Sequence, residues 1–246
     1  MEKEQYQLMY ELELHHWWYR GMQAITRSLL EGTLPKKAEL AILDAGCGSG
    51  GMLLFLSRYG CTTGVDISPD ALARSRSREL KKLIRGSIAD LPLADGAFDL
   101  VTSFDVIYHR AVGEDVVALK ELCRVLKAGG RLLVRVPAYE FMRGHHDEAV
   151  HTRHRYRAPE LKEKLAATGF EVERMTYANT LLFPLAAAKR ALERKKGLAP
   201  EDASDLRPLH PVADAIMGAV LGLEARLVPR IALPFGLSLF CVAKKV

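Results

Sequence analysis

Cysteine is scarce in this chain, and no cysteine motif is present. The four cysteines are scattered through 246 residues without a C-x-x-C pair. We therefore expect neither a disulfide framework nor a zinc site, and we expect the protein to reside in a reducing compartment. The first residues are charged and polar, unlike a signal peptide, and charges interrupt the apolar segments too often for a membrane span. We expect a cytoplasmic protein.

The sequence also lacks repeats and a charge excess strong enough to identify a partner. Its net charge is +5, and both signs are mixed along most of the chain, so the charge alone does not indicate nucleic-acid binding. A chain of 246 residues can bury one large core. We predict a single domain over residues 1–246.

Glycine, in contrast, is concentrated in residues 43–51 (LDAGCGSGG). This run follows an apolar segment, 40–43, that predicts a buried strand, and it precedes another, 52–56, that predicts a helix. Glycines at alternate positions let the backbone turn sharply and admit a ligand against bare main chain. The first N–H groups of the following helix point into the same turn. The run predicts a site for a nucleotide-type ligand at the end of a parallel strand.

Two acidic residues help to choose the ligand. The glycines fit the dinucleotide pattern G-x-G-x-x-G if Gly51 is counted, and G-x-G-x-G if Gly50 is counted. Asp44 precedes the first glycine, where it would repel a pyrophosphate and attract an amino group. Asp66 ends the next predicted strand, 20 residues after Gly46, which is the expected place for an acceptor to a ribose diol. Asp66 fits any adenosine ligand, whereas Asp44 favours a cationic one without phosphate.

Five segments in order resemble the motifs of the class I S-adenosylmethionine-dependent methyltransferases. One such segment would be weak evidence, but five in the right order and spacing are specific, and together they cover roughly residues 40–176. The segments are 43–50, 64–68, 86–93, 98–106 and 125–134.

The resemblance implies S-adenosyl-L-methionine as cofactor and S-adenosyl-L-homocysteine as product. Its first motif would wrap the methionine end, Asp66 would hold the ribose hydroxyls, and Asp90 would accept from the adenine amino group while Leu91 lines the ring. The cofactor-binding residues it implies are Asp44, Gly46, Cys47, Gly48, Gly50, Asp66, Ile67, Ala89, Asp90, Leu91, Phe104 and Asp105.

The alternation of strand and helix patterns predicts a doubly wound α/β sheet. The resemblance implies a Rossmann-like sheet of seven strands in the order 3-2-1-4-5-7-6, the last strand antiparallel. We expect helices between the first five strands, and we place the strands at 40–45, 61–66, 82–86, 98–104, 130–136, 170–176 and 236–243. We divide the domain into an N-terminal helical lid (1–35), a cofactor-binding core (36–176), a helical insertion (177–235) and a last strand (236–246).

Both tryptophans lie in the segment 15–22 (HHWWYRGM), outside the core motifs. An amphipathic helix that packs these rings on the core is one interpretation. The other is a lid made by Trp17, Trp18, Tyr19 and Arg20, in which Tyr19 or Arg20 reaches the cofactor's carboxylate and an indole encloses the reacting centre. A looser resemblance links the segment to a family subset of small-molecule or surface-glycan pathways.

Four of the eight histidines lie within residues 145–154, which follow the fifth predicted strand and so emerge at the ligand edge. Histidines and carboxylates could bind a metal, but the neighbouring arginines would repel a cation, and we predict no metal. We favour a polar wall of the acceptor pocket over a solvated surface loop. His146 or His151 would be a base or an orienting group, and Arg153 and Arg155 would bind an anionic group. The predicted substrate-side residues are Tyr139, His145, His151, Arg153, Arg155 and Tyr156.

Residues 177–235 fit no core motif. An apolar stretch, 181–188, runs into the basic segment 189–196, and a later helical stripe consists of Val212, Ile216, Val220, Leu223 and Leu227. Peripheral membrane contact, an oligomer face, a lid and a core cover all fit this pattern. We favour a substrate-side cover over a pocket for an apolar or lipid-linked acceptor.

The sequence therefore predicts a methyltransferase that acts on a small molecule, apolar or anionic, with the acceptor atom (O, N or C) and the oligomeric state left open. His109 and His146 are the candidate bases if the acceptor must lose a proton, although His109 fits a structural role equally well. The alternatives are an NAD(P)-dependent oxidoreductase and a protein that binds the cofactor without catalysis. Nucleic acid is disfavoured as substrate, because FDVI at 104–107 stands where base-modifying relatives carry an N-P-P-Y-like tetrad.

Overall fold

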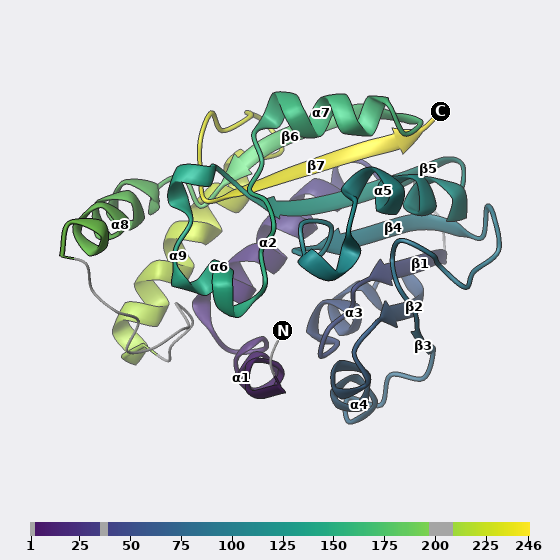
Figure 1. Ribbon diagram of the computed structural model, residues 1–246, viewed down its shortest axis with the longest axis horizontal. Helices are drawn as coiled ribbons and strands as arrows, with labels where there is room; N and C mark the ends of the chain where they lie inside the picture. The colour runs from purple at the N-terminus through teal and green to yellow at the C-terminus, as the bar shows by residue number, and fades with distance from the viewer. Residues whose placement is uncertain (1–2, 35–38, 197–208) are drawn as a thin grey trace.

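The computed structural model describes residues 3–34, 39–196 and 209–246. Its centre is a seven-stranded sheet in the order β3-β2-β1-β4-β5-β7-β6, which confirms the predicted topology. The first five strands pair in parallel, and β7 runs antiparallel to both β5 and β6 (Figure 1). The strands are β1 (Leu40–Ala45), β2 (Gly60–Asp66), β3 (Leu83–Arg85), β4 (Phe98–Phe104), β5 (Leu126–Pro137), β6 (Phe170–Ala178) and β7 (Ser238–Lys245).

Helices cover both faces of this sheet, as its apolar strands require. The α-helices are α1 (Lys3–Leu12), α2 (Trp17–Glu31), α3 (Gly51–Leu56), α4 (Pro69–Arg76), α5 (Asp115–Val125), α6 (His145–Ala149), α7 (Ala158–Ala166), α8 (Phe183–Lys196) and α9 (Pro211–Leu227), and short 3₁₀ turns are η1 (Arg110–Val112) and η2 (Glu140–Met142).

Two clusters of buried side chains divide the core between the sheet faces. On one face α5 and α7 pack against residues such as Val101 and Val134. On the other, α2, α3 and α9 pack against Ile42, Leu133 and Phe240. The carboxyl ends of the parallel strands lie between these layers and face α1 (Figure 1). Residues that follow β1, β2, β4 and β5 are therefore brought to one edge.

The expectation of helices between the first five strands is wrong at one connection. No helix joins β3 to β4; residues 86–97 form a loop closed by an isolated bridge between Ser87 and Asp90. Pro92 and Gly96 interrupt this segment, and only Ile88 and Leu91 are fully buried in it. Too few apolar residues are present for a helix with a buried stripe. The fifth strand also begins at Leu126 rather than at 130.

The predicted stripe on α9 is not the face that packs on the molecule. Val212, Ile216 and Leu223 are 61%, 59% and 50% exposed. The buried face is formed instead by Leu221, Glu224 and Ala225. Both faces of this helix carry apolar residues, so periodicity alone could not identify the inner one. The side chains of the basic run at 194–196 are not described, and residues 197–208, predicted as a loop, lie outside the described residues.

The contact between α2 and α9 depends on one glycine. A Cβ on Gly21 would lie 2.3 Å from the Cδ1 of Leu221. We expect Gly21→Ala to lower the free energy of unfolding by about 1–3 kcal/mol, because overpacking outweighs a helix-propensity gain of about 1 kcal/mol. Urea denaturation measures the change.

The matched control is Gly222→Ala in α9, where an added Cβ would have no neighbour within 4 Å. This change should stabilise the protein by about 0.5–1 kcal/mol. The double variant Gly21→Ala/Leu221→Ala should lose less stability than the sum of the two single changes, because the two side chains compete for the same space. An unchanged or higher stability of Gly21→Ala would contradict the close approach of the two helices.

Candidate functional site

The glycine run forms a tight loop between β1 and α3. Gly46, Gly48 and Gly50 have φ values of +88°, +54° and +89°, a region that side-chain-bearing residues rarely adopt. The N–H groups of Gly46 and Cys47 donate to the Val65 carbonyl at 2.7 and 2.9 Å. These bonds fix the loop to the end of β2. The Cys47 thiol is buried, which raises its pKa, so it acts as a small apolar group.

Asp44 is a buried carboxyl at the end of β1. It is 2% exposed, and its Oδ1 accepts a 2.7 Å hydrogen bond from the Thr102 hydroxyl on β4. Burial raises the pKa of Asp44 to about 7, and the bond from Thr102 opposes that rise. A carboxyl in this state gains from a cationic partner, because pairing offsets the desolvation of its charged form.

Asp66 connects the glycine loop to the start of α4. Its Oδ2 accepts from the Gly48 N–H at 2.9 Å, and its Oδ1 accepts from the Ser68 N–H at 2.8 Å. Each carboxylate oxygen keeps lone-pair capacity for another donor, such as a ribose hydroxyl.

The other residues predicted for the adenosine end lie near this corner of the sheet. Ile67, directly after Asp66, is 52% exposed. Ala89, Asp90 and Leu91 lie in the β3–β4 loop, with Asp90 exposed and Leu91 buried. The Leu91 N–H donates to Glu121 of α5 at 2.8 Å, which ties the loop to the core.

Phe104 and Asp105 lie at the exit of β4, beside a residue that the sequence analysis missed. Arg135 of β5 pairs with Phe104 across the strands and donates from Nη2 to the Asp105 carboxylate at 2.5 Å. Asp105 adopts φ +59°, which turns the chain back at this edge. A single charge inside the apolar run LLVRVP was the sequence signal for Arg135.

The predicted lid residues of α2 diverge. Trp18 lies over Arg135, with the guanidinium carbon 4.9 Å from the ring centroid, and burial raises the pKa of the Tyr19 hydroxyl. Arg20 points elsewhere: its Nη2 lies 2.6 Å from Asp214 of α9. Asp214 also accepts from the Trp17 N–H at 2.9 Å. Trp18 and Tyr19 thus face the carboxyl edge, while Trp17 and Arg20 anchor α2 to α9.

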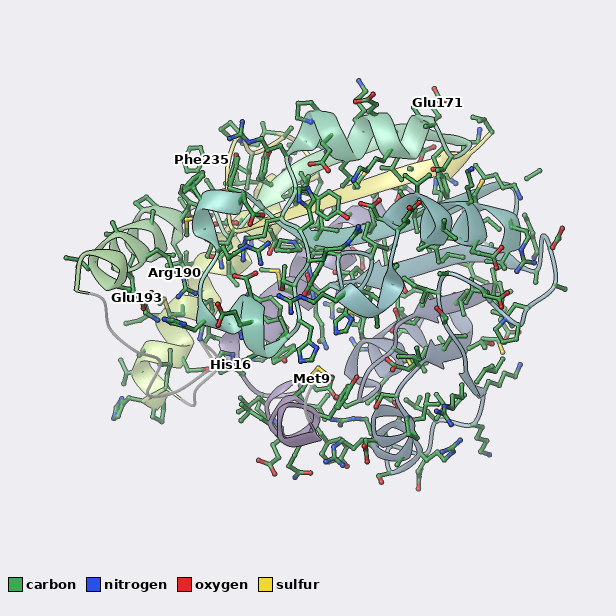
Figure 2. The ribbon with its side chains drawn as sticks, viewed as in Figure 1. Met9, His16, Glu171, Arg190, Glu193 and Phe235 are labelled. Atoms are coloured by element: carbon green, nitrogen blue, oxygen red, sulfur yellow. The ribbon has the colours of Figure 1, made fainter. Side chains whose placement is uncertain are left out.

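Helix α1, which the sequence analysis did not single out, lies closer to the glycine loop. Met9 points from α1 toward the carboxyl edge (Figure 2), and a Cβ on Gly48 would lie 2.8 Å from its methyl carbon. Tyr6 is close to Ser68 and Asp66, and burial raises its pKa. Tyr6, Met9 and Leu12 follow a helical spacing that could have indicated this contact.

A buried ion pair fixes α1 in place. Arg78 donates to Glu13 and to the carbonyl of Tyr10 at 2.7 and 2.8 Å, and both charged side chains are under 10% exposed (7% and 8%). Arg78 also donates from Nε to the Ser49 carbonyl at 3.0 Å. One guanidinium therefore holds both the helix and the glycine loop.

The two candidate bases lie in different segments. His109 caps η1 by accepting from the Ala111 N–H at 3.0 Å, and its ring stacks on His151 with centroids 5.6 Å apart. Burial lowers the pKa of His109 to about 4, so the ring is neutral at pH 7. His146 lies in α6, next to His145.

The predicted arginines of the polar wall are engaged within the protein. Arg155 donates to both oxygens of Asp147 at 2.8 and 2.9 Å. Arg153 lies 3.7 Å from Asp115, whose carboxylate accepts from the buried Tyr156 hydroxyl at 2.6 Å. These contacts brace the segment itself. No cluster of His, Cys, Asp or Glu suited to a metal occurs among the residues the structure describes.

Tyr139, which precedes the histidine-rich segment, belongs to a cluster of aromatic side chains. Its ring stacks on Tyr177 with centroids 5.2 Å apart. Phe141 is tilted by 30° against it, and Phe183 lies edge-on to it. From α8, Arg190 and Glu193 point toward α6 (Figure 2). Within the described ranges, no helix is long and apolar enough to cross a membrane.

Comparisons with known proteins agree on one family. Residues 43–134 match the family model described as a methyltransferase domain. A "Probable S-adenosylmethionine-dependent methyltransferase" of Mycolicibacterium smegmatis is 33% identical over 163 residues, 64% of this chain and 61% of that protein. These similarities support a class I S-adenosylmethionine-dependent methyltransferase domain around residues 43–134.

One further relative in sequence and one solved structure are also similar to this chain. A malonyl-[acyl-carrier protein] O-methyltransferase of Enterobacter lignolyticus is 32% identical over 120 residues, 48% of this chain and 47% of that protein. A phosphoethanolamine-type N-methyltransferase of Haemonchus contortus, solved with S-adenosylhomocysteine, shares the fold with a TM-score of 0.56 and 19% identity, over 90% of this chain and 52% of that one. The chain spans about half the length of the curated relatives it matches.

The residues at the carboxyl edge fit S-adenosylmethionine, the cofactor of this methyltransferase family. With the cofactor bound, Asp44 would offer a carboxyl to the cationic amino-acid end, and Asp66 would offer two acceptor oxygens to the ribose. The glycines leave the main chain bare between them. Because Tyr6 and Met9 lie over Asp66 and Gly48, we expect α1 to shift when the cofactor binds.

The Arg78–Glu13 pair should contribute to folding stability. Arg78→Ala leaves Glu13 buried without its cation, and we expect the free energy of unfolding to fall by about 3 kcal/mol. Thermal denaturation measures this change. Replacing Glu13 by Gln in the same variant should restore part of the stability, because the uncompensated charge is gone. The exposed pair Arg124–Asp95 is the control: Asp95, with a side chain 79% exposed, should tolerate Ala with a change below about 0.5 kcal/mol.

Cofactor affinity should depend on pH through Asp44. Its pKa of about 7 means that the carboxyl is mostly protonated at pH 6, and a cationic ligand prefers the ionised form. Affinity for S-adenosylhomocysteine should therefore rise with pH, up to tenfold per unit below about 7, and level off above it. Calorimetric titrations from pH 5.5 to 8 measure the slope.

Asp44→Asn is the matched control for this dependence, because the amide keeps the shape and cannot titrate. Its slope should vanish, and binding should be weak at every pH. Thr102→Val should move the midpoint upward, since the Thr102 hydroxyl stabilises the ionised carboxylate. An identical slope in wild type and Asp44→Asn would contradict the assignment.

Proposed function

We propose that this protein transfers a methyl group from S-adenosylmethionine to a small-molecule acceptor by in-line displacement. The observation that carries the proposal is the pairing of a buried carboxyl, Asp44, with a ribose-type acceptor, Asp66, on either side of a bare glycine loop. The oxidoreductase alternative is not favoured, because Asp44 would repel a pyrophosphate.

The bound cofactor would supply a methyl group already activated by its sulfonium. The protein's own contribution is then alignment and exclusion of water, and positioning of this kind is worth on the order of 7–11 kcal/mol. Trp18 and the half-buried Tyr19 face the carboxyl edge from α2. Their low polarity suits a reaction in which a positive charge disappears.

A base is required only for an acceptor that must lose a proton. His109 and His146 are the proposed groups. The low pKa of His109, about 4, makes it a weak base. Its Nδ1 accepts from the Ala111 N–H, so the neutral ring carries its proton on Nε2, and Nδ1 would have to give up that bond to take a proton from the acceptor. An acceptor that is already anionic would need neither histidine. The malonyl-[acyl-carrier protein] O-methyltransferase relative supports an oxygen acceptor of this kind.

Formation of S-adenosylhomocysteine tests the proposal. Purified protein is incubated with S-adenosylmethionine and, in turn, with carboxylic acids, phenols and amines of small size, and the thioether product is measured by mass spectrometry. We expect product only with an acceptor, and a loss of at least a hundredfold in Asp44→Ala. Asp95→Ala should keep full activity. Cofactor binding with no turnover on any acceptor would support the non-catalytic alternative and contradict the proposal.

A further inference from the structure

Arg135 is a charged residue enclosed in the sheet. It is 5% exposed, and its neighbours across the strands are Phe104 of β4 and Phe240 of β7. A charge buried in this way must be matched by partners, since desolvation otherwise disfavours the folded state. The hydrogen bonds and ring contacts of its guanidinium therefore indicate the role of Arg135.

The protein accepts hydrogen bonds from only one side of the guanidinium. Nε and Nη2 both donate to Oδ2 of Asp105, at 2.8 and 2.5 Å. Nη1 is buried, and no hydrogen-bond partner for it exists among the residues that the structure describes. An unmet donor on a buried cation is unfavourable, and buried groups of this kind are expected to have a function or a ligand.

Aromatic rings surround the unmet donor. The guanidinium carbon lies 4.9 Å from the ring centroid of Trp18, 5.2 Å from that of Phe104 and 5.7 Å from that of Phe240. Trp18 belongs to the lid helix α2, whereas the other two rings belong to the sheet. A ligand oxygen could reach Nη1 if the Trp18 ring moved aside. The rest of that ligand would then lie between aromatic rings.

Arg135 stands two strands away from Asp44 in the sheet, and its positive charge still acts on that carboxyl and opposes the rise in its pKa that burial causes. Asp44 lies near the end of β1 and Asp66 is the last residue of β2, and β4 stands between β1 and β5 in the sheet. Arg135 therefore lies on the side of β4 away from β1, which is where we place the acceptor. Asp105 already balances its charge, and a bound sulfonium would add one positive charge nearby. An anionic group placed between the guanidinium and the sulfonium would be attracted by both in this low-dielectric region.

We propose that Arg135 binds a carboxylate of the acceptor through Nη1, and that the acceptor is a small carboxylic acid with an apolar body that lies against Trp18 and Phe104. This inference rests on the proposed methyl transfer, because it names the substrate class of that same site. It makes Arg135 a residue that determines acceptor specificity.

Binding without turnover tests this inference, with Trp18 as the reporter. The chain has two tryptophans, so Trp17→Phe leaves Trp18 as the single emitter, 4.9 Å from the guanidinium. The protein is saturated with S-adenosylhomocysteine and titrated with benzoate, cinnamate and hexanoate, and then with the corresponding primary amides. We expect saturable emission changes with at least one acid and at least tenfold weaker binding of its amide.

Arg135→Lys and Arg135→Gln should each weaken acid binding at least tenfold. Arg131→Gln is the matched control: Arg131 lies on the same strand and donates from Nε and Nη2 to Glu173 at 2.7 and 3.0 Å, and its loss should leave acid binding unchanged. Retained binding of S-adenosylhomocysteine shows that a variant is folded. If Arg135→Gln does not fold, Arg135→Lys and the acid–amide comparison on the parent protein decide the question.

The possible outcomes distinguish a failure of the proposed methyl transfer from a failure of the role of Arg135. Failure of the parent protein to bind S-adenosylhomocysteine contradicts the proposed function itself. Normal binding of that thioether with no response to any acid, or with equal affinity for acids and amides, overturns the role of Arg135 alone. A loss of S-adenosylhomocysteine binding in Arg135→Lys, with 5′-methylthioadenosine unaffected, would assign Arg135 to the cofactor's own carboxylate and also overturn the inference.

Discussion

The parallel pairing of β1 with β2 and β4 is the constraint on which the rest of the site depends. In this register Asp44 stands opposite Gly64 and Thr102, so the carboxyl is buried and receives the Thr102 hydroxyl. The same pairing ends β2 beside the glycine loop, where Asp66 accepts from the Gly48 N–H. A shift of one residue would turn these side chains to opposite faces. The chemistry of the edge is therefore inseparable from the sheet.

Two N-terminal helices complete this edge in different ways. Helix α2 packs on the sheet and on α9 through Gly21, which lets it bring Trp18 over Arg135. Helix α1 is held by fewer contacts, chiefly those of Arg78 with Glu13 and Tyr10, and its side chains lie over the glycine loop. A segment held by few contacts opens more readily than the core. The structure thus joins an edge fixed by α2 to a glycine loop covered by α1, whose main attachment is one buried ion pair.

Much of this arrangement could be predicted from the sequence, because it depends on patterns within short segments of the chain. Continuous apolar runs predict strands buried on both faces, and the glycine run with Asp44 and Asp66 predicts the cofactor edge. The rest depends on tertiary contacts. Both faces of α9 are apolar, so only its packing on Gly21 decides that Leu221 is inside and Ile216 is outside. Arg135 looked like an interruption in an apolar run until the strands brought Asp105 to it. The missing helix between β3 and β4 reflects a segment too short and too polar to cover the sheet.

The central claim is that the glycine loop with Asp66 binds an adenosyl ligand and not a dinucleotide. Calorimetric titration of the purified protein with S-adenosylmethionine, S-adenosylhomocysteine and NADH, repeated on Asp66→Ala, tests it most directly. The account predicts binding of the two adenosyl ligands by the wild type, loss of that binding in Asp66→Ala, and no binding of NADH. Absence of adenosyl binding, or binding of NADH in its place, would contradict the account.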